Sequence, residues 1–225
     1  MIEYLDAIDK SLLIYLNSLH CNFFDVFMWY VSKTATWILM TLVLLFIVFR
    51  KNSKQSLLVI LGIALTILFA DQISSGLIKG LVERFRPTHN PDIGNLIHVV
   101  NGYRGGLYGF VSSHAANTLG VAVFISLLFR NKILCATLIF WSTLVAYSRI
   151  YLGVHYPGDI LGGMCVGLFS GVIAYKIYNL SSLKLFGVDT NNSFNVEISK
   201  ESHYMTYGIL CNLLVTLIVS FSCVI

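Results

Sequence analysis

Six long apolar stretches set the strongest limit on what this chain can fold into. They fall at about residues 34–49, 56–78, 113–129, 133–151, 158–178 and 204–225. A helix that crosses a bilayer needs roughly 20 predominantly apolar residues, with a range of about 17–25. The sequence therefore predicts an all-α, polytopic membrane bundle of about six transmembrane helices. The first stretch is short unless its helix begins near Met28, so five spans with an interfacial sixth helix is the alternative.

The composition agrees with an integral membrane protein. Of the 225 residues, 56% are hydrophobic and only 12% are charged, whereas soluble domains have about 25% charged residues. The net charge of +4 comes without a basic run or interleaved basic and aromatic residues, which argues against a nucleic-acid partner. The five cysteines are scattered and form no CxxC motif or Cys/His cluster. We therefore expect neither a disulfide framework nor a metal site.

The N-terminal segment has a different pattern from the apolar stretches. Acidic residues (Glu3, Asp6 and Asp9) precede the first long apolar run, so we expect no cleavable signal peptide. Apolar residues recur at helical spacing at Leu5, Ile8, Leu12, Leu13 and Leu16. This pattern predicts an amphipathic helix that lies in the membrane interface.

The chain is expected to divide into three regions. Residues 1–32 form the interfacial amphipathic region, and residues 33–180 form the transmembrane core that carries the motifs described below. Residues 181–225 comprise a polar connector and a C-terminal transmembrane helix. The regular repeat of Gly163, Gly167 and Gly171 in the fifth apolar stretch predicts a face for close helix packing.

The Lys and Arg residues in short loops predict the orientation of the bundle. Three alternate connections should share the cytoplasmic side; their cations are Arg50, Lys51, Lys54, Arg130, Lys132, Lys176, Lys184 and Lys200. Most of the remaining Lys and Arg residues lie in or near the motif loops. We expect them to serve the functional site there, so they are not counted in predicting the orientation. We therefore expect the motif loops to face outward.

The first motif block is Lys79-x6-Arg86-Pro87, at the end of the second apolar stretch. Lys79 and Arg86 are about two helical turns apart and would share a face if the helix continued. Pro87 disfavours helix at Arg86, so the helix should stop or loosen there. The alternative is a basic fringe at a helix end, and Glu83 and Arg84 fit that description.

The other two blocks add hydroxyl groups, histidines and an acid. Ser112-Ser113-His114 opens the third stretch, where free backbone N–H groups at a helix start bind anions. Ser148-Arg149-x5-His155-x3-Asp159 spans the turn between the fourth and fifth stretches. The alternatives are a simple N-cap at Ser112 and a structural turn histidine at His155. Because charges next to hydrocarbon are costly, the coincidence of three such blocks on one membrane face predicts a phosphate-handling site.

These blocks, in this order and spacing, resemble the type 2 phosphatidic acid phosphatase superfamily over about residues 30 to 180. That family contains membrane lipid phosphatases and, more remotely, soluble vanadium haloperoxidases. The resemblance implies a helical membrane core with a metal-independent active site and no cofactor. The middle block of the family usually reads Pro-Ser-Gly-His, whereas here Val111 and Ser113 replace the Pro and the Gly.

The resemblance also implies roles for individual residues. His155 would be the nucleophile that forms a phosphohistidine, Asp159 would orient it, and His114 would protonate the leaving oxygen. The phosphoryl oxygens would be bound by Lys79, Arg86, Arg149, Ser112 and Ser113. Asp71, within the second stretch, is expected to have a structural or supporting role.

The expected function is a lipid phosphatase of the bacterial inner membrane whose site faces the periplasm. The segment 101–110 is similar to family members from lipid-A-bearing bacteria, which favours lipid A or undecaprenyl diphosphate as the substrate. Phosphatidylglycerol phosphate and phosphatidic acid are alternatives, and no obligate protein partner is expected. The predicted spans argue against a haloperoxidase. A non-catalytic membrane protein with a vestigial phosphate site is a further alternative, although His114, His155 and Asp159 are all present.

Overall fold

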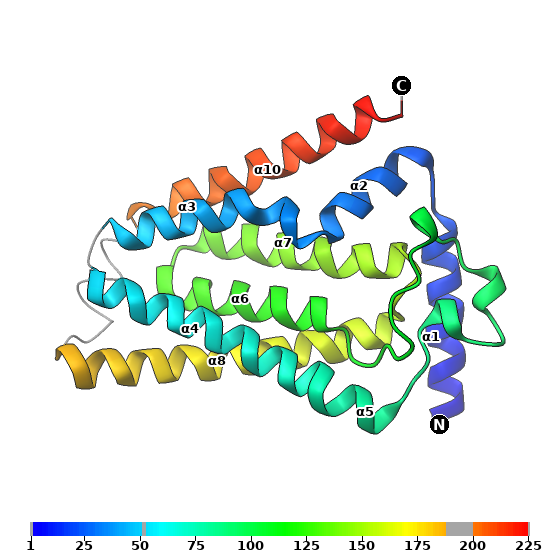
Figure 1. Cartoon of the computed structure of the whole chain (residues 1–225), viewed down its shortest axis with the longest axis horizontal. Coiled ribbons are helices and arrows are strands. Elements are labelled where there is room, and N and C mark those ends of the chain that lie inside the picture. The colour runs from blue at the N-terminus through cyan, green and yellow to red at the C-terminus, as the bar shows by residue number, and fades with distance from the viewer. Residues whose placement is uncertain (1, 51–52, 188–199, 225) are drawn as a thin grey trace.

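The computed structural model describes residues 2–50, 53–187 and 200–224, and within these ranges the secondary structure is helical (Figure 1). The long helices run side by side along one axis and form a bundle. Their bounds are α2 (Asn22–Ser32), α3 (Ile38–Phe49), α4 (Ser53–Asp71), α6 (Ser113–Phe129), α7 (Lys132–Tyr151), α8 (Pro157–Phe186) and α10 (Ser202–Ser222). The predicted all-α membrane bundle is confirmed.

Four helical segments of the described chain are long and apolar enough to cross a membrane: Lys54–Val82, α7, α8 and α10. A fifth arises if α2 and the segment Thr34–Phe49, which meet at an angle of 70°, form one broken span. Helix α6 is apolar but only 17 residues long. The number of six spans therefore stays a prediction.

The first predicted span begins earlier than its apolar stretch and contains a sharp bend. Helix α2 ends at Ser32, and a 3-10 turn, Thr34–Trp37, leads into α3. Two side chains bind carbonyl groups at the end of α2: the Trp37 indole donates to Val31 O (3.0 Å) and the Thr36 hydroxyl to Tyr30 O (2.6 Å). Satisfying these groups lets the helix break inside the apolar layer.

Helices α6 and α8 approach closely through the predicted glycine face. A Cβ atom on any of the three glycines would collide with a backbone carbonyl oxygen of the facing segment; the pairs are Gly163 with Ser112, Gly167 with Ala116 and Gly171 with Gly120. Small residues permit this backbone-to-backbone approach between membrane helices. The contact brings the start of α6 against the start of α8, where Ser112 N donates to Asp159 O (2.9 Å).

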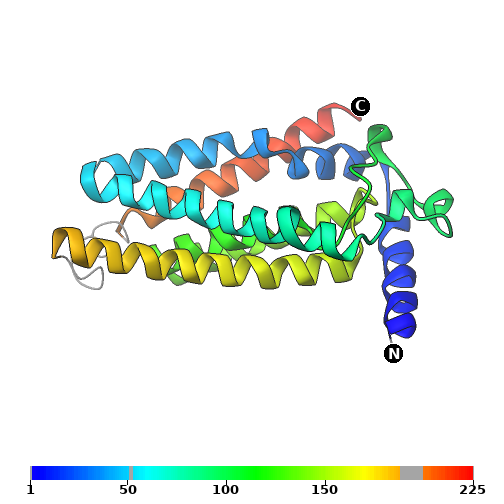
Figure 2. The same cartoon turned by 60° about the horizontal axis from the view of Figure 1, so that its bottom comes forward.

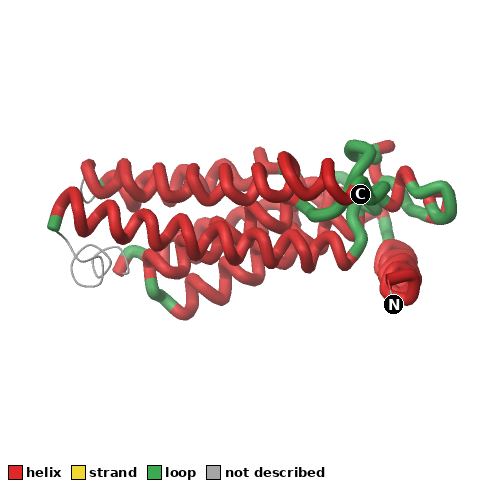
Figure 3. Tube along the Cα trace, turned by 90° about the horizontal axis from the view of Figure 1, so that it is seen from below, coloured by secondary structure: helices red, strands yellow, loops and turns green. Residues whose placement is uncertain are grey.

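Helix α1 (Ile2–Ser18) lies across one end of the bundle, roughly perpendicular to the long helices (Figures 1 and 2). Its exposed side chains include Leu5, Ile8 and Leu12, whereas Leu13 is buried. The view from below shows α1 nearly end-on beside the loops at this end of the bundle (Figure 3). This arrangement is compatible with a helix parallel to a membrane surface, and its place in the interface stays a prediction.

The segment between α5 (Lys79–Val82) and α6 is a long loop at the same end of the bundle as α1. The helix ends at Val82, four residues before Arg86, because Glu83 adopts a left-handed conformation (φ 49°). The helix thus stops before Arg86, as Pro87 led us to expect, and Lys79 and Arg86 do not share a helical face. Arg86 is instead held by backbone pairing within the loop, where its N–H donates to Leu107 O (2.9 Å).

Helix α8 extends beyond residue 180, where the transmembrane core was expected to end. Helix α8 continues through Phe186 and is capped by Gly187 in a left-handed conformation (φ 62°), so the start of the predicted polar connector is helical. Residues 188–199 of that connector lie outside the described residues. Helix α10 then provides the expected C-terminal apolar helix.

The glycine face gives a direct stability prediction. Gly167→Leu should destabilise the protein by about 1–3 kcal/mol, because a side chain there has to push α6 away from α8. Gly80→Leu is the matched control, since a Cβ at Gly80 meets no atom within 4 Å. Thermal unfolding in detergent measures both, and equal midpoints for the two variants would contradict the role of the glycine face.

Candidate active site

The turn between α7 and α8 pairs His155 with Asp159. Pro157 occupies the first position of α8 and Asp159 the third, so the carboxylate points back at the turn and accepts from Tyr156 N (3.0 Å). The His155 Nδ1 and Asp159 Oδ2 atoms are 3.3 Å apart, and both side chains are buried. An ionised carboxylate only accepts hydrogen bonds, so this pairing places the imidazole proton on Nδ1 and leaves a lone pair on Nε2.

Arg86 lies against that lone pair. Its Nη1 is 2.9 Å from His155 Nε2 and also donates to Val154 O (3.2 Å), while its Nε donates to Tyr108 O (3.1 Å). A guanidinium group only donates, so Nε2 accepts here and His155 is neutral. Burial, together with the positive charges of Arg86, Arg149 and Lys79, holds the pKa of His155 well below its usual range.

Arg149 provides a second buried guanidinium group near the end of α7. It donates to the Ser32 hydroxyl at the end of α2 and to the Tyr103 hydroxyl in the loop (3.1 Å). Its guanidinium carbon lies 5.5 Å from the centre of the Tyr103 ring. Three segments far apart in the sequence therefore meet at this cation.

Lys79 is held by hydroxyl groups. Its Nζ donates to Ser113 Oγ (2.8 Å) and to Ser75 Oγ (3.2 Å). The segment Gln72–Ile78 is π-helical, and the Ser74 and Ser75 hydroxyls lie 3.0 Å and 2.6 Å from Ser113 Oγ. Short π-helical segments are frequent at functional sites.

Ser112 and Ser113 have different positions at the start of α6. Ser112 is the N-cap, and its side chain accepts from Ala115 N (3.5 Å), which agrees with the N-cap alternative for this residue. Ser113 is the one that contacts Lys79. Asp71 lies at the junction between α4 and the π-helical turn, and its supporting role stays a prediction.

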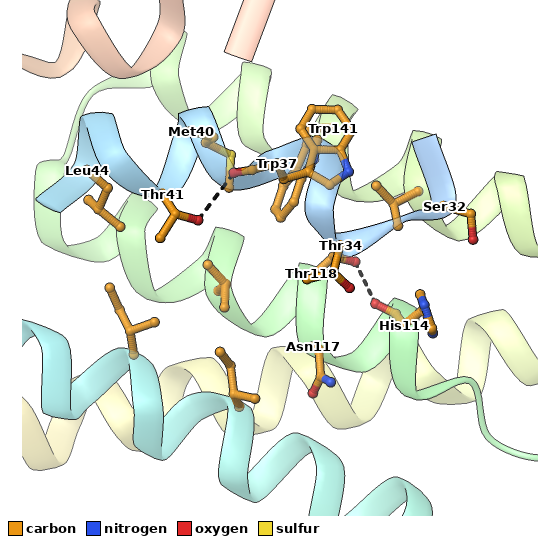
Figure 4. A pocket seen from close by; sticks show the side chains of 14 residues that line it. Ser32, Thr34, Trp37, Met40, Thr41, Leu44, His114, Asn117, Thr118 and Trp141 are labelled. Atoms are coloured by element: carbon orange, nitrogen blue, oxygen red, sulfur yellow. Dashed lines mark hydrogen bonds between the residues drawn. The ribbon is translucent and has the colours of Figure 1, made fainter. Parts of the chain in front are cut away.

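His114, in the first turn of α6, lines a cavity of about 340 Å³ between α3, α4, α6 and α7. His114 and Ser32 lie at one end of the cavity and Leu44 at the other (Figure 4). Apolar side chains form most of the wall; they include Trp37, Met40, Leu44, Ile63, Ile67, Val121 and Val145. The cavity thus joins a histidine to an apolar space inside the bundle.

Arg84 is not part of a basic fringe at the helix end, as its position in the sequence suggested, but binds three carboxylates. Its Nη1 donates to Asp159 Oδ1 (3.1 Å) and to Asp9 Oδ2 (2.8 Å), and its Nη2 donates to Asp6 Oδ1 (2.7 Å). The acidic partners lie 75 or more positions away in the sequence, so no local pattern indicated the contact. The only available signal was the presence of acidic residues on α1.

A family model for the PAP2 superfamily matches residues 56–182, more than half of the chain and all three motif blocks. The chain belongs to the PAP2 superfamily. It is 41% identical to the lipid A 4'-phosphatase of Porphyromonas gingivalis over 78% of this chain and 75% of that protein. It is 40% identical to the lipid A 4'-phosphatase of Bacteroides thetaiotaomicron over 82% of this chain and 83% of that protein.

A solved structure agrees with the fold. The PAP2-type phosphatidylglycerolphosphate phosphatase of Bacillus subtilis aligns with a TM-score of 0.61 and 20% identity, over 81% of this chain and 89% of that chain. Together these similarities show that the chain is a membrane lipid phosphatase, and therefore a hydrolase. The haloperoxidase and non-catalytic alternatives are set aside. The roles of the individual site residues stay predictions.

The neutral state of His155 predicts the acid limb of the pH profile. Because the pKa of His155 is lowered, its neutral form persists as the pH falls through 6.5, and protonation of the nucleophile should reduce kcat/KM only well below that pH. Measuring kcat/KM between pH 4 and 8 tests this. An acid limb centred near 6.5 would show that His155 titrates as an ordinary exposed histidine.

Proposed function

We propose that this enzyme removes a phosphate group from lipid A by forming a phosphohistidine on His155. The observation that carries the proposal is the neutral His155, with Asp159 on Nδ1 and a guanidinium cation on Nε2. A nucleophile next to cations and oriented by an acid is the arrangement that attack on a phosphate monoester needs.

The first step transfers the phosphoryl group to the enzyme. The bound phosphate takes over the N–H of Arg86 from Nε2 of His155, and its negative charge favours the protonated form of His114. Nε2 then attacks phosphorus, the bond from phosphorus to the lipid oxygen breaks, and the cationic His114 gives its proton to that oxygen. The developing charge on the phosphoryl oxygens is stabilised by Lys79, Arg86 and Arg149. Asp159 stabilises the positive charge that His155 acquires.

The second step frees the enzyme. A water molecule gives a proton to His114 and attacks phosphorus, the bond from phosphorus to Nε2 breaks, and inorganic phosphate leaves. His114 thus acts as acid and then as base, which returns it to its starting state. Splitting the displacement into two steps through a covalent intermediate lowers each barrier.

The relatives support lipid A over the other lipids, and the cavity next to His114 is compatible with it. The relatives that match three quarters or more of this chain at about 40% identity are named lipid A 4'-phosphatases. The cavity next to His114 is apolar over most of its length, which suits an acyl chain of the leaving lipid alcohol. Undecaprenyl diphosphate remains the second candidate, because an isoprenoid chain also suits an apolar wall.

The enzyme is proposed to lie in the bacterial inner membrane with its site facing the periplasm. The junctions between α3 and α4 and between α6 and α7 lie at the end of the bundle opposite the motif loops (Figure 1). These junctions contain or adjoin Arg50, Lys54, Arg130 and Lys132. An excess of Lys and Arg marks cytoplasmic loops. This separation supports an outward-facing active site.

A substrate panel tests the proposal. Purified protein in detergent should release phosphate from lipid A faster than from undecaprenyl diphosphate, phosphatidylglycerol phosphate or phosphatidic acid. His155→Ala should lose essentially all turnover, because it removes the attacking atom. His203→Ala is the matched control, since His203 is exposed on α10. Full activity in His155→Ala would refute the mechanism, and fastest release from another lipid would refute the substrate.

Metal chelation tests whether the proposed reaction proceeds without a metal ion. The proposed chemistry uses only histidines, an acid and cationic side chains, so EDTA should leave kcat unchanged within about twofold. Phosphate release before and after dialysis against EDTA measures this. Loss of activity that returns on adding Mg²⁺ or Zn²⁺ would contradict a site that works without metal.

A further inference from the structure

An ion network joins helix α1 to the rear of the active-site carboxylate. Arg84 is its centre and binds Asp159 Oδ1 (3.1 Å), Asp9 Oδ2 (2.8 Å) and Asp6 Oδ1 (2.7 Å). Asp159 is fully buried, and the side chains of Asp9 and Arg84 are only 14% and 22% exposed. Because these groups are largely removed from water, their interactions are screened much less than those of surface pairs.

The two oxygens of Asp159 face different partners. Oδ2 lies against His155 Nδ1 and Tyr156 N, whereas Oδ1 accepts from Arg84. Arg84 therefore contacts the carboxylate through the oxygen that His155 does not use. A change at Arg84 reaches the nucleophile through Asp159.

Arg84 is itself fixed in place from two directions. Its guanidinium carbon lies over the Tyr156 ring, 3.9 Å from the ring centre, in a cation–π contact. Its planar guanidinium group donates to the carboxylates in fixed directions, whereas the donors of a lysine ammonium rotate freely. The Tyr156 ring and the carboxylates together hold the Arg84 guanidinium group in one orientation.

Helix α1 also docks directly on the start of α8. Asp9 Oδ1 accepts from Gly158 N (2.7 Å), one of the free N–H groups of the first turn of α8. A Cβ atom on Gly158 would lie 2.7 Å from Asp9 Oδ2, so the glycine lets the carboxylate approach. One side chain of α1 therefore holds both Arg84 and the helix turn that carries Asp159.

We propose that Arg84 and Asp9 are positioning residues of the phosphatase reaction, through which helix α1 fixes Asp159 and hence the orientation of His155. The inference rests on the histidine mechanism proposed above. Helix α1 would then contribute to catalysis, because it supplies Asp9, the first residue in the series of contacts Asp9–Arg84–Asp159–His155.

The test measures kcat and KM of four variants: Arg84→Met, Arg84→Lys, Asp9→Asn and the double variant Asp9→Asn/Arg84→Met. The substrate is lipid A, or whichever lipid of the panel the wild-type enzyme cleaves fastest. Loss of a residue that orients a metal-binding side chain typically costs roughly 10–100-fold in affinity or activity, and we expect a loss of the same order for a residue that orients Asp159. Arg84→Met should lower kcat by that factor with KM within about twofold, because Arg84 contacts Asp159 and none of the cations proposed to bind the phosphoryl group. Arg84→Lys should recover part of the loss, since one cation remains beside Asp159.

Asp9→Asn isolates the charge of Asp9, because the amide oxygen can still accept from Gly158 N. It should lower kcat less than Arg84→Met does. The double variant should be no slower than Arg84→Met alone, since Asp9 acts through Arg84 and the two effects are not independent. Asp92→Asn is the matched control: Asp92 is 71% exposed and does not contact Arg84, but reaches the network only at its edge, through Lys10, which also pairs with Asp6 (3.1 Å).

Several outcomes would overturn the proposal. Wild-type kcat in Arg84→Met, a double variant whose loss is the product of the two single losses, or an equal loss in Asp92→Asn would each do so. A fall in the thermal midpoint that tracks kcat across all variants would show that α1 only stabilises the fold. His155→Ala is run alongside: if it stays active, both proposals fail, whereas an inactive His155→Ala with a fully active Arg84→Met overturns this one alone.

Discussion

The close contact between α6 and α8 is the constraint on which the rest of the site depends. Because glycines on α8 let the two backbones touch, Ser112 N reaches Asp159 O (2.9 Å). That hydrogen bond makes the middle and last motif blocks one structural unit. The serine-histidine turn and the histidine-aspartate turn therefore keep a fixed relative position, even though α7 separates them in the chain.

The two cations of the first motif block contact this unit from different kinds of segment. Lys79 comes from a helix and meets Ser113, whereas Arg86 comes from the loop and meets His155. Buried cations are costly unless polar groups surround them, and the loop supplies such groups with Tyr108 O and the Tyr103 hydroxyl. The long loop is thus explained by the need to hold guanidinium groups at the end of an apolar bundle.

Local patterns in the sequence predicted the helices, the glycine face and the positions of Ser112 and Asp159, because helical periodicity and capping act over a few residues. Contacts between distant segments were not predictable in this way. Arg84 looks like a basic fringe until the acidic residues of α1 are brought beside it, 75 positions or more away. The bend between α2 and α3 was missed for a related reason: its stabilising hydrogen bond, from Trp37 to Val31 O, has no distinctive spacing.

The departure from the family pattern at Ser113 is best understood from its neighbours. A glycine there would offer no side chain, whereas the Ser113 hydroxyl accepts from Lys79 Nζ (2.8 Å) and lies within hydrogen-bond distance of Ser74 and Ser75. The hydroxyls of Ser74 and Ser75 reach Ser113 from the π-helical turn Gln72–Ile78, and such turns are frequent at functional sites. The extra hydroxyl and the irregular helix therefore belong together, and they hold the lysine in place without removing any group from the site.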